Sequence, residues 1–161
     1  MNVYLGLGTN QGNKYKNIQN AVNAISLECG EFISKSSIYE SPPWGFKTEE
    51  SFYNSVVHIK TELLPEELLY SCKKIEVALG RKKKTKLSYE SRIIDIDILL
   101  YDNINLDLKD LKIPHPLMNN RIFVLRPLIE LLEKKDAALE DYYKTKLSDC
   151  TDKSILKIVQ S

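Results

Sequence analysis

The chain has 161 residues, of which 43% are hydrophobic and 28% are charged, and its formal net charge is +1. This length fits one domain with a buried core, and the composition excludes a disordered chain. A net charge near zero argues against a broad nucleic-acid-binding surface, so any basic function must be local. We therefore expect a single domain over residues 1–161 and no nucleic-acid partner.

The N-terminal residues and the cysteines indicate the compartment. The chain starts with a strand-like pattern instead of a basic region and a long apolar run, and its longest apolar runs are only a few residues. This pattern predicts neither a signal peptide nor a membrane span. Three widely spaced cysteines without a Cys-x-x-Cys pair favour neither a disulfide framework nor a zinc site. We expect a cytoplasmic protein.

The first half of the chain predicts two strands around a helix, followed by a third strand. Residues 3–7 are apolar and precede a Gly-Thr-Asn turn, which is typical of a strand. Apolar residues at helical spacing then predict a helix that ends at Gly30. Residues 32–39 and 52–61 are predicted strands. The segment that connects these two strands contains Pro42, Pro43 and Gly45, which predict a long, stiff loop.

The second half completes a recognisable order of elements. Pro65 and the two glutamates after it suit the first turn of a second helix, which Gly80 ends. Isoleucine-rich residues 92–101 predict a strand. The order β-α-β-β-α-β predicts a ferredoxin-like α+β fold, in which an antiparallel sheet carries its helices on one face. A further helix is expected after Pro127, and the C-terminal residues are expected to be partly helical.

Two carboxylates share one face of the strand predicted over residues 92–101. Asp95 and Asp97 project together because alternate residues of a strand point the same way, while the isoleucines between them should face the helices. Two negative charges ~6.6 Å apart repel by about 2 to 3 kcal/mol at an effective dielectric constant of ~20, and magnesium would relieve this repulsion. A strand face wetted by water explains the pair equally well.

Basic residues on either side of this strand favour a nucleotide site. Residues 81–86 read Arg-Lys-Lys-Lys-Thr-Lys, Arg92 opens the strand, and His115 and Arg121 follow it. Magnesium ATP needs carboxylates for the metal and cationic groups for the phosphate oxygens. Each lysine alone would be read as part of a solvated loop, and His115 as a packed or capping residue. Only the combination predicts phosphoryl transfer.

The same residues resemble the 6-hydroxymethyl-7,8-dihydropterin pyrophosphokinase family of folate biosynthesis. The signature is an Arg-x-x-Asp-x-Asp strand, here Arg92 to Asp97. Further matches follow in the family's order over about the first 130 residues: Leu5 to Asn10, Tyr39 to Gly45, Phe52 to Asn54, Ile75 to Arg81, and Pro114 to Phe123.

The resemblance implies a ferredoxin-like fold and transfer of the β,γ-diphosphate of ATP to the pterin hydroxymethyl group, with release of AMP. It implies ATP as co-substrate and two magnesium ions, held by Asp95 and Asp97. It assigns catalysis to Arg81, Arg92, Asp95 and Asp97, and ATP binding to Glu76, Lys84, Arg92, His115 and Arg121. It assigns pterin binding to Ser41, Pro42, Pro43, Trp44, Phe52, Asn54, Asp95 and Phe123.

This sequence departs from the family pattern in the basic loop. Residues 89–91 differ from the family's common residues, and one extra residue lies between Arg81 and Arg92. Four lysines of the loop could contact phosphate, and we assign this role to Lys84. Pro116 stands where an aromatic residue is common.

Two other functions remain open on the residues alone. A ferredoxin-like RNA-binding module would stack bases on strand aromatics, although the Gly-Phe-x-Phe type of motif is absent. A simple ATP-dependent kinase of a small heterocycle, or a nucleotidyltransferase, would use the same carboxylates and arginines. We expect a monomer that binds ATP and hydroxymethyldihydropterin.

Overall fold

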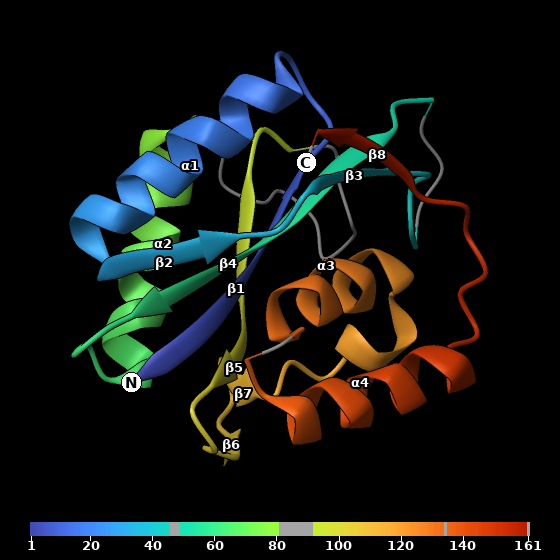
Figure 1. Cartoon of the computed structure of the whole chain (residues 1–161). Helices are drawn as coiled ribbons and strands as arrows, with labels where there is room; N and C mark the ends of the chain where they lie inside the picture. Colours follow the sequence, from blue (N-terminus) through green and yellow to red (C-terminus); the bar gives the residue numbers. More distant parts are fainter. Residues whose placement is uncertain (46–48, 81–91, 134, 161) are drawn as a thin grey trace.

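The structure is a computed structural model that describes residues 1–45, 49–80, 92–133 and 135–160. Its elements follow one another in the order shown in Figure 1. They are β1 (Asn2–Thr9), α1 (Lys14–Glu28), β2 (Glu31–Lys35), β3 (Ile38–Ser41), β4 (Phe52–Lys60), α2 (Pro65–Ala78), β5 (Asp95–Tyr101), β6 (Leu106–Asp107), β7 (Lys112–Ile113), a 3-10 turn (Met118–Asn120), α3 (Ile122–Leu132), α4 (Ala137–Asp149) and β8 (Lys157–Gln160).

The main sheet has the strand order β5-β1-β4-β3-β8, and β2 also pairs with β4. All of these pairs are antiparallel. Helix α1 connects β1 to the β2–β3 segment and α2 connects β4 to β5, which gives the predicted β-α-β-β-α-β order. The predicted α+β fold class is confirmed.

One face of the sheet packs against α1 and α2. Its buried cluster joins alternate residues of β1 with Ile18 and Ile25 of α1 and with Leu68 and Ile75 of α2. The three isoleucines at positions 94, 96 and 98 belong to the same cluster. This confirms that these isoleucines face the helices, and it turns the side chains between them to the opposite face.

The opposite face of the sheet is also covered, which corrects the prediction of helices on one face only. Helices α3 and α4 lie on the other side of the sheet from α1 and α2 (Figure 1). A second buried cluster joins Tyr4, Val56 and Leu99 of the sheet with six residues of α3, among them Leu125 and Leu128. The sequence predicted a helix after Pro127 and helical C-terminal residues, but local periodicity does not report which face of the sheet a helix covers.

Helix α3 begins at Ile122 and contains Pro127, whereas the sequence predicted that the helix starts after this proline. Proline has no N–H, so the carbonyl oxygen of Phe123, four residues earlier, accepts no helical hydrogen bond from Pro127. The buried residues Val124 and Leu128 lie on either side of the proline. Their packing against the sheet stabilises the helix through this position.

The strand predicted over residues 32–39 is divided into β2 and β3 at Ser36 and Ser37. Ser36 Oγ accepts a hydrogen bond from Val56 N at 2.9 Å, and Ser37 donates from N and Oγ to Glu130 Oε1 at 2.8 and 2.9 Å. The two serines thus connect this segment both to β4, through Ser36, and to α3, through Ser37. Tyr39 OH donates to the other Glu130 oxygen at 2.8 Å, so α3 is attached to β3.

The strand predicted from residue 92 begins at Asp95. Arg92 is held instead by a buried asparagine: its N–H donates to Asn10 Oδ1 at 2.7 Å, and its carbonyl accepts from Asn10 N at 3.2 Å.

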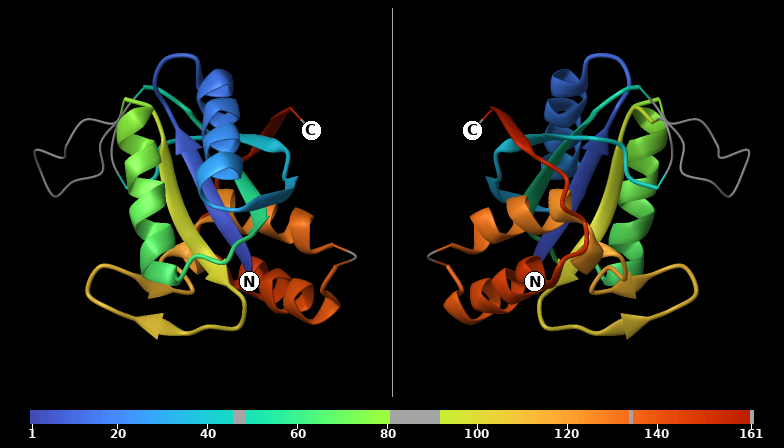
Figure 2. Two further views of the ribbon diagram at one scale, coloured as in Figure 1. Left: turned by 90° about the vertical axis from the view of Figure 1, so that its left-hand side faces the viewer. Right: turned by 90° about the vertical axis from the view of Figure 1, so that its right-hand side faces the viewer.

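The C-terminal residues contribute α4 and also β8, a strand that was not predicted. Figure 2 shows this last segment rising from α4 to the sheet. No helix within the described ranges is long and apolar enough to cross a membrane.

Gly30 lies between α1 and β2 with a φ of 151°, and a Cβ added there would stand 2.2 Å from the carbonyl oxygen of Lys60. We expect Gly30→Ala to lower the free energy of unfolding by about 2 to 3 kcal/mol, measured by urea denaturation. Gly12 is the matched control, because its φ is also positive (62°) but no atom lies within 4 Å. Gly12→Ala should cost about 1 kcal/mol. Equal losses would contradict the assigned contact.

Candidate active site

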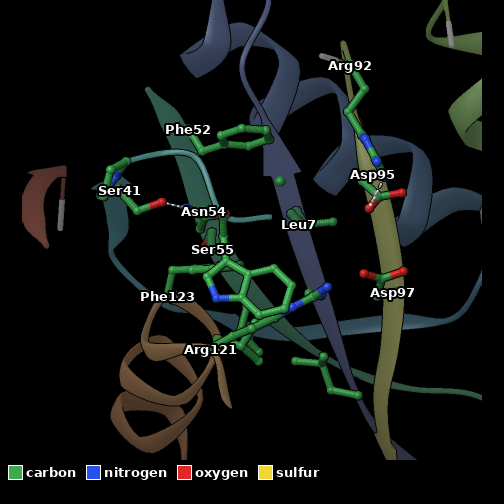
Figure 3. A pocket seen from close by; sticks show the side chains of 17 residues that line it. Leu7, Ser41, Phe52, Asn54, Ser55, Arg92, Asp95, Asp97, Arg121 and Phe123 are labelled. Atoms are coloured by element: carbon green, nitrogen blue, oxygen red, sulfur yellow. Dashed lines mark hydrogen bonds and ion pairs between the residues drawn. The ribbon is translucent and has the colours of Figure 1, made fainter. Parts of the chain in front are cut away.

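A pocket lies on the sheet face that carries α3, with about 710 Å³ of empty space that is partly open to solvent. Its walls come from β1, β3, β4, β5 and the start of α3, and Figure 3 shows the side chains around it. The lining residues are Gly6, Leu7, Gly8, Ser41, Pro42, Trp44, Phe52, Asn54, Ser55, Val56, Arg92, Asp95, Asp97, Leu99, Arg121, Phe123 and Val124.

The floor of the pocket is formed by two glycines of the central strand β1. Gly8 pairs with Asn54 of β4 on one side and with Asp95 of β5 on the other. Gly6 pairs in the same way with Val56 and Asp97. Because glycine carries no side chain, the Gly8 row leaves space between the Asn54 side chain and the Asp95 carboxylate. In the Gly6 row the side chain of Leu99 lies beside the glycine, 3.3 Å from the position that a Cβ would take. This register creates a flat floor with different chemistry at its two edges.

The β5 edge carries the two predicted carboxylates. Arg92 Nη1 donates to Asp95 Oδ2 at 2.6 Å, and both side chains are mostly buried. His115 Nε2 lies 3.9 Å from Asp97 Oδ2. His115 Nδ1 accepts from Leu117 N at 3.2 Å, which leaves Nε2 as the protonated nitrogen facing Asp97 in the neutral ring. Figure 3 shows Arg92, Asp95 and Asp97 in sequence along one side of the pocket.

The negative charges of Asp95 and Asp97 are not neutralised by His115, whose neutral form is favoured. Burial raises the pKa of Asp97 above its ordinary value, and the negative charge of Asp95 raises it further. Burial also lowers the pKa of His115 although Asp97 opposes this shift, so a positive charge on the ring is disfavoured. The side chain of Asp97 keeps 34% of its surface exposed. A hard cation with oxygen ligands fits such a pair.

No group of three or more His, Cys, Asp or Glu side chains gathers within metal-binding distance in the part of the chain that the structure describes. A cation at Asp95 and Asp97 would therefore have two carboxylate ligands among the described residues and room for water or substrate oxygens. Magnesium is bound in this manner in many phosphoryl-transfer sites.

Glu76 supports the acidic strand from behind. It is 1% exposed, and its Oε1 accepts from Ile96 N at 2.7 Å and from Lys73 Nζ at 3.1 Å. The backbone between the two aspartates is therefore attached to α2. Glu76 does not line the pocket in this structure, and the same is true of His115 and Pro43.

The β4 edge offers polar groups in a rigid arrangement. Asn54 and Ser41 are 4% and 3% exposed, and Asn54 Nδ2 donates to Ser41 Oγ at 2.8 Å. Because this bond fixes the amide, its position in the pocket is defined before any ligand enters. Phe52 lies above Asn54, and Phe123 comes from the start of α3 (Figure 3).

Arg121 occupies the space between the aromatic residues and the acidic strand. Its side chain is buried, with the guanidinium carbon 4.5 Å from the ring centre of Trp44 and 5.9 Å from that of Phe123. Stacking of this kind holds a guanidinium group in place while its N–H groups remain directed sideways. Arg121 and Arg92 thus bring two positive charges to the same pocket as the two aspartates.

The structure brings together ten of the residues proposed from the sequence as pocket-lining groups, and Arg81 and Lys84 lie outside the described residues. Sequence reasoning missed the glycines of the floor, Gly6 and Gly8. The alternation Gly-Leu-Gly-Thr inside a strand was the available signal, because glycine within a strand often marks a close approach by a ligand. It also missed the apolar wall formed by Val56, Leu99 and Val124, which depends on tertiary packing.

Comparison with known proteins shows one family. The family model described as 7,8-dihydro-6-hydroxymethylpterin-pyrophosphokinase (HPPK) matches residues 4–133. A relative from Aquifex aeolicus, named 2-amino-4-hydroxy-6-hydroxymethyldihydropteridine pyrophosphokinase, is 39% identical over 155 residues, which is 96% of this chain and 93% of that protein. A Bacillus subtilis protein of the same name is 38% identical over 132 residues, 81% of this chain and 78% of that one.

Solved structures with the same fold are HPPK-DHPS proteins. One, described as HPPK-DHPS in complex with substrates, has a TM-score of 0.67 and 16% identity, and the match covers 92% of this chain and 43% of that chain. The wild-type Plasmodium falciparum HPPK-DHPS with pteroate also has a TM-score of 0.67, at 19% identity, over 92% and 44%. This chain spans less than half the length of either. On the family match and the full-length relative, the chain belongs to the HPPK family.

Proposed function

We propose that the pocket on the α3 side of the sheet is where this chain transfers the β,γ-diphosphate of ATP to the hydroxymethyl group of hydroxymethyldihydropterin in folate biosynthesis. AMP is the second product. The chain is a diphosphotransferase of the HPPK family, and the observation that supports this location best is the pair of rows Asn54–Gly8–Asp95 and Val56–Gly6–Asp97. They give a flat heterocycle a floor, and they put the metal-binding carboxylates at one edge of it.

The pterin is proposed to lie over the two glycines. Its faces would stack against Phe52 and Phe123, and its amide-like edge would meet Asn54 and the loop from Ser41 to Trp44. Offset aromatic stacking and a few fixed polar groups are the usual way to hold such a ring. The hydroxymethyl group then points toward Asp95 on β5.

ATP is proposed to bind on the β5 side, with Arg92, His115 and Arg121 around its phosphates. Asp95 and Asp97 would hold magnesium, two ions according to the family resemblance, and this metal would neutralise phosphate charge when bound. Glu76 is proposed to contact the nucleotide in addition to its support of β5. Arg81 and Lys84, outside the described residues, are kept as predicted phosphate contacts.

The chain's own residues act mainly by position and charge. In the reaction, the hydroxymethyl oxygen loses its proton to water and bonds to the β-phosphorus, while the bond from this phosphorus to the bridging oxygen of AMP breaks. The guanidinium groups of Arg92 and Arg121 would stabilise charge on the phosphate oxygens during this exchange. The pocket holds the two reactants in line, and no covalent intermediate with the protein is required.

We also propose that the chain works as a monomeric single domain in the cytoplasm. The three cysteines are free and buried, which fits a reducing compartment. Light scattering after size-exclusion chromatography tests the monomer. A mass twice that of the chain would contradict it.

The reaction is tested by incubation with hydroxymethyldihydropterin, ATP and magnesium, followed by separation of the nucleotides. We expect AMP and the pterin diphosphate in equal amounts, because the bond that breaks lies between the α and β phosphates. ADP as the nucleotide product would contradict diphosphate transfer and would favour a simple kinase.

The floor is tested with Gly8→Ala. A Cβ at this position would lie 3.5 Å from Asn54 Oδ1, an ordinary contact, so the variant should fold with an unchanged melting temperature. It would nevertheless raise the floor where the ring is proposed to lie, and we expect the Kd for the pterin to rise at least about tenfold. Isothermal titration calorimetry measures this, with Gly12→Ala as the control outside the pocket. An unchanged Kd would mean that the ring binds elsewhere.

The metal site is tested with Asp97→Asn, which keeps the shape of the side chain and removes its charge. We expect kcat to fall by about 100-fold or more, and Mn²⁺ binding, followed by electron paramagnetic resonance in the presence of ATP, to weaken. Asp107→Asn is the control, because Asp107 is an exposed aspartate on β6 paired with Lys112 at 2.6 Å. If the two variants behaved alike, Asp97 would not be a metal ligand.

A further inference from the structure

The C-terminal residues 150–160, which we name the strap, connect the two walls of the pterin pocket. The strap leaves α4 at Cys150, which is 2% exposed and belongs to the buried cluster of α3. It then runs along the outside of the molecule and ends as β8 beside β3 (Figure 1). The family model ends at residue 133, so the strap lies beyond the part of the chain that the model matches.

The first attachment of the strap is at the start of α3. Asp152 Oδ2 accepts from Ile122 N at 3.2 Å, and Asp152 Oδ1 accepts from Ser154 N at 3.0 Å, which holds the carboxylate in place. Helix α3 has no side-chain cap from Arg121 and no acidic residue in its own first turn. Asp152 therefore supplies the negative charge and the acceptor that this helix end needs.

This helix end is part of the pocket. Ile122 stands between Arg121 and Phe123, and both of these residues line the pocket. A capped first turn fixes the directions in which their side chains leave the helix. A frayed first turn would let both side chains move, because their backbone would no longer be held in helical geometry.

The second attachment is at the opposite wall. β8 pairs with β3 through Tyr39 with Ile158 and Glu40 with Lys157. The next residue of β3 is Ser41, which lines the pocket and accepts the hydrogen bond from Asn54. β8 thus extends the sheet beside the strand that leads into the Pro-Pro loop.

We propose that the strap sets the width of the pterin pocket, and that Asp152 is a positioning residue for pterin binding through α3. This inference rests on the proposed function. Asp152 touches neither substrate, and it acts through the backbone of Ile122. The strap makes no attachment to β5 in the hydrogen bonds and strand pairs of the described residues, so the carboxylates should keep their geometry when it is loosened.

The test compares Asp152→Ala, Asp152→Asn and Asp149→Ala in the full chain. Asp152→Ala removes the acceptor, Asp152→Asn keeps an oxygen acceptor, and Asp149 is an exposed control at the end of α4. We expect Asp152→Ala to raise the pterin Kd by about fivefold, with kcat at saturating substrates less affected. Asp152→Asn keeps one oxygen acceptor for Ile122 N but cannot also accept from Ser154 N, so its Kd should rise less than that of Asp152→Ala, and Asp149→Ala should leave the Kd unchanged. The Kd is measured by calorimetry at a temperature at which circular dichroism shows each variant fully folded.

A second variant, lacking residues 157–161, loosens the other wall and should also raise the pterin Kd while retaining the fold. Unchanged affinity in this variant and in folded Asp152→Ala would overturn the proposal, as would equal losses in Asp152→Ala and Asp149→Ala. Absence of pterin binding by the unchanged chain would overturn the proposed function, and the role of the strap with it.

Discussion

The antiparallel register of three strands is the constraint on which the candidate site depends. β1 places Gly6 and Gly8 between side chains of β4 and carboxylates of β5, so that polar, open and acidic positions follow one another across the sheet. A shift of one residue would turn the carboxylates into the core beside α1 and α2 and would bring isoleucines to the pocket. The hydrophobic pattern of β5 prevents this shift, because its isoleucines are buried in the cluster shared with both helices. The packing that stabilises the fold therefore also orients the chemistry.

Helix α3 closes the site, and it is held by groups distant in the sequence. Glu130 binds Ser37 and Tyr39, Asp152 binds the first N–H of the helix, and apolar residues pack against the sheet. Burial and the hydrogen bond to Glu130 raise the pKa of Tyr39 to about 12, so this contact persists through the neutral range. The helix brings Arg121 and Phe123 to a pocket whose other residues come from strands. A rigid strand floor thus meets an aromatic and cationic wall whose position depends on these contacts.

The order of the elements and the position of the acidic strand could be predicted from the sequence, because both depend on the local spacing of apolar residues. Asp95 and Asp97 share a face in any regular strand, and the isoleucines decide which face is buried. A helix after Pro127 was also predicted, but its start and its place on the second face of the sheet were not. Pro127 interrupts the local signal for α3, and the division at Ser36 and Ser37 arises from a carboxylate 93 residues away. The strap could not be predicted, and the glycines of β1 gave only a local signal, because the role of both depends on which strands are neighbours.

The central claim is that the pterin lies over Gly6 and Gly8, with its hydroxymethyl group directed at the acidic strand. A crystal structure of the chain with hydroxymethyldihydropterin, magnesium and α,β-methylene ATP tests it most directly, because the carbon replaces the oxygen at the bond that breaks. We predict the ring above the two glycines, its polar edge at Asn54, its hydroxymethyl oxygen facing the β-phosphorus, and metal density at Asp95 and Asp97. A pterin ring bound away from the β1 glycines, or carboxylates without metal, would contradict the account.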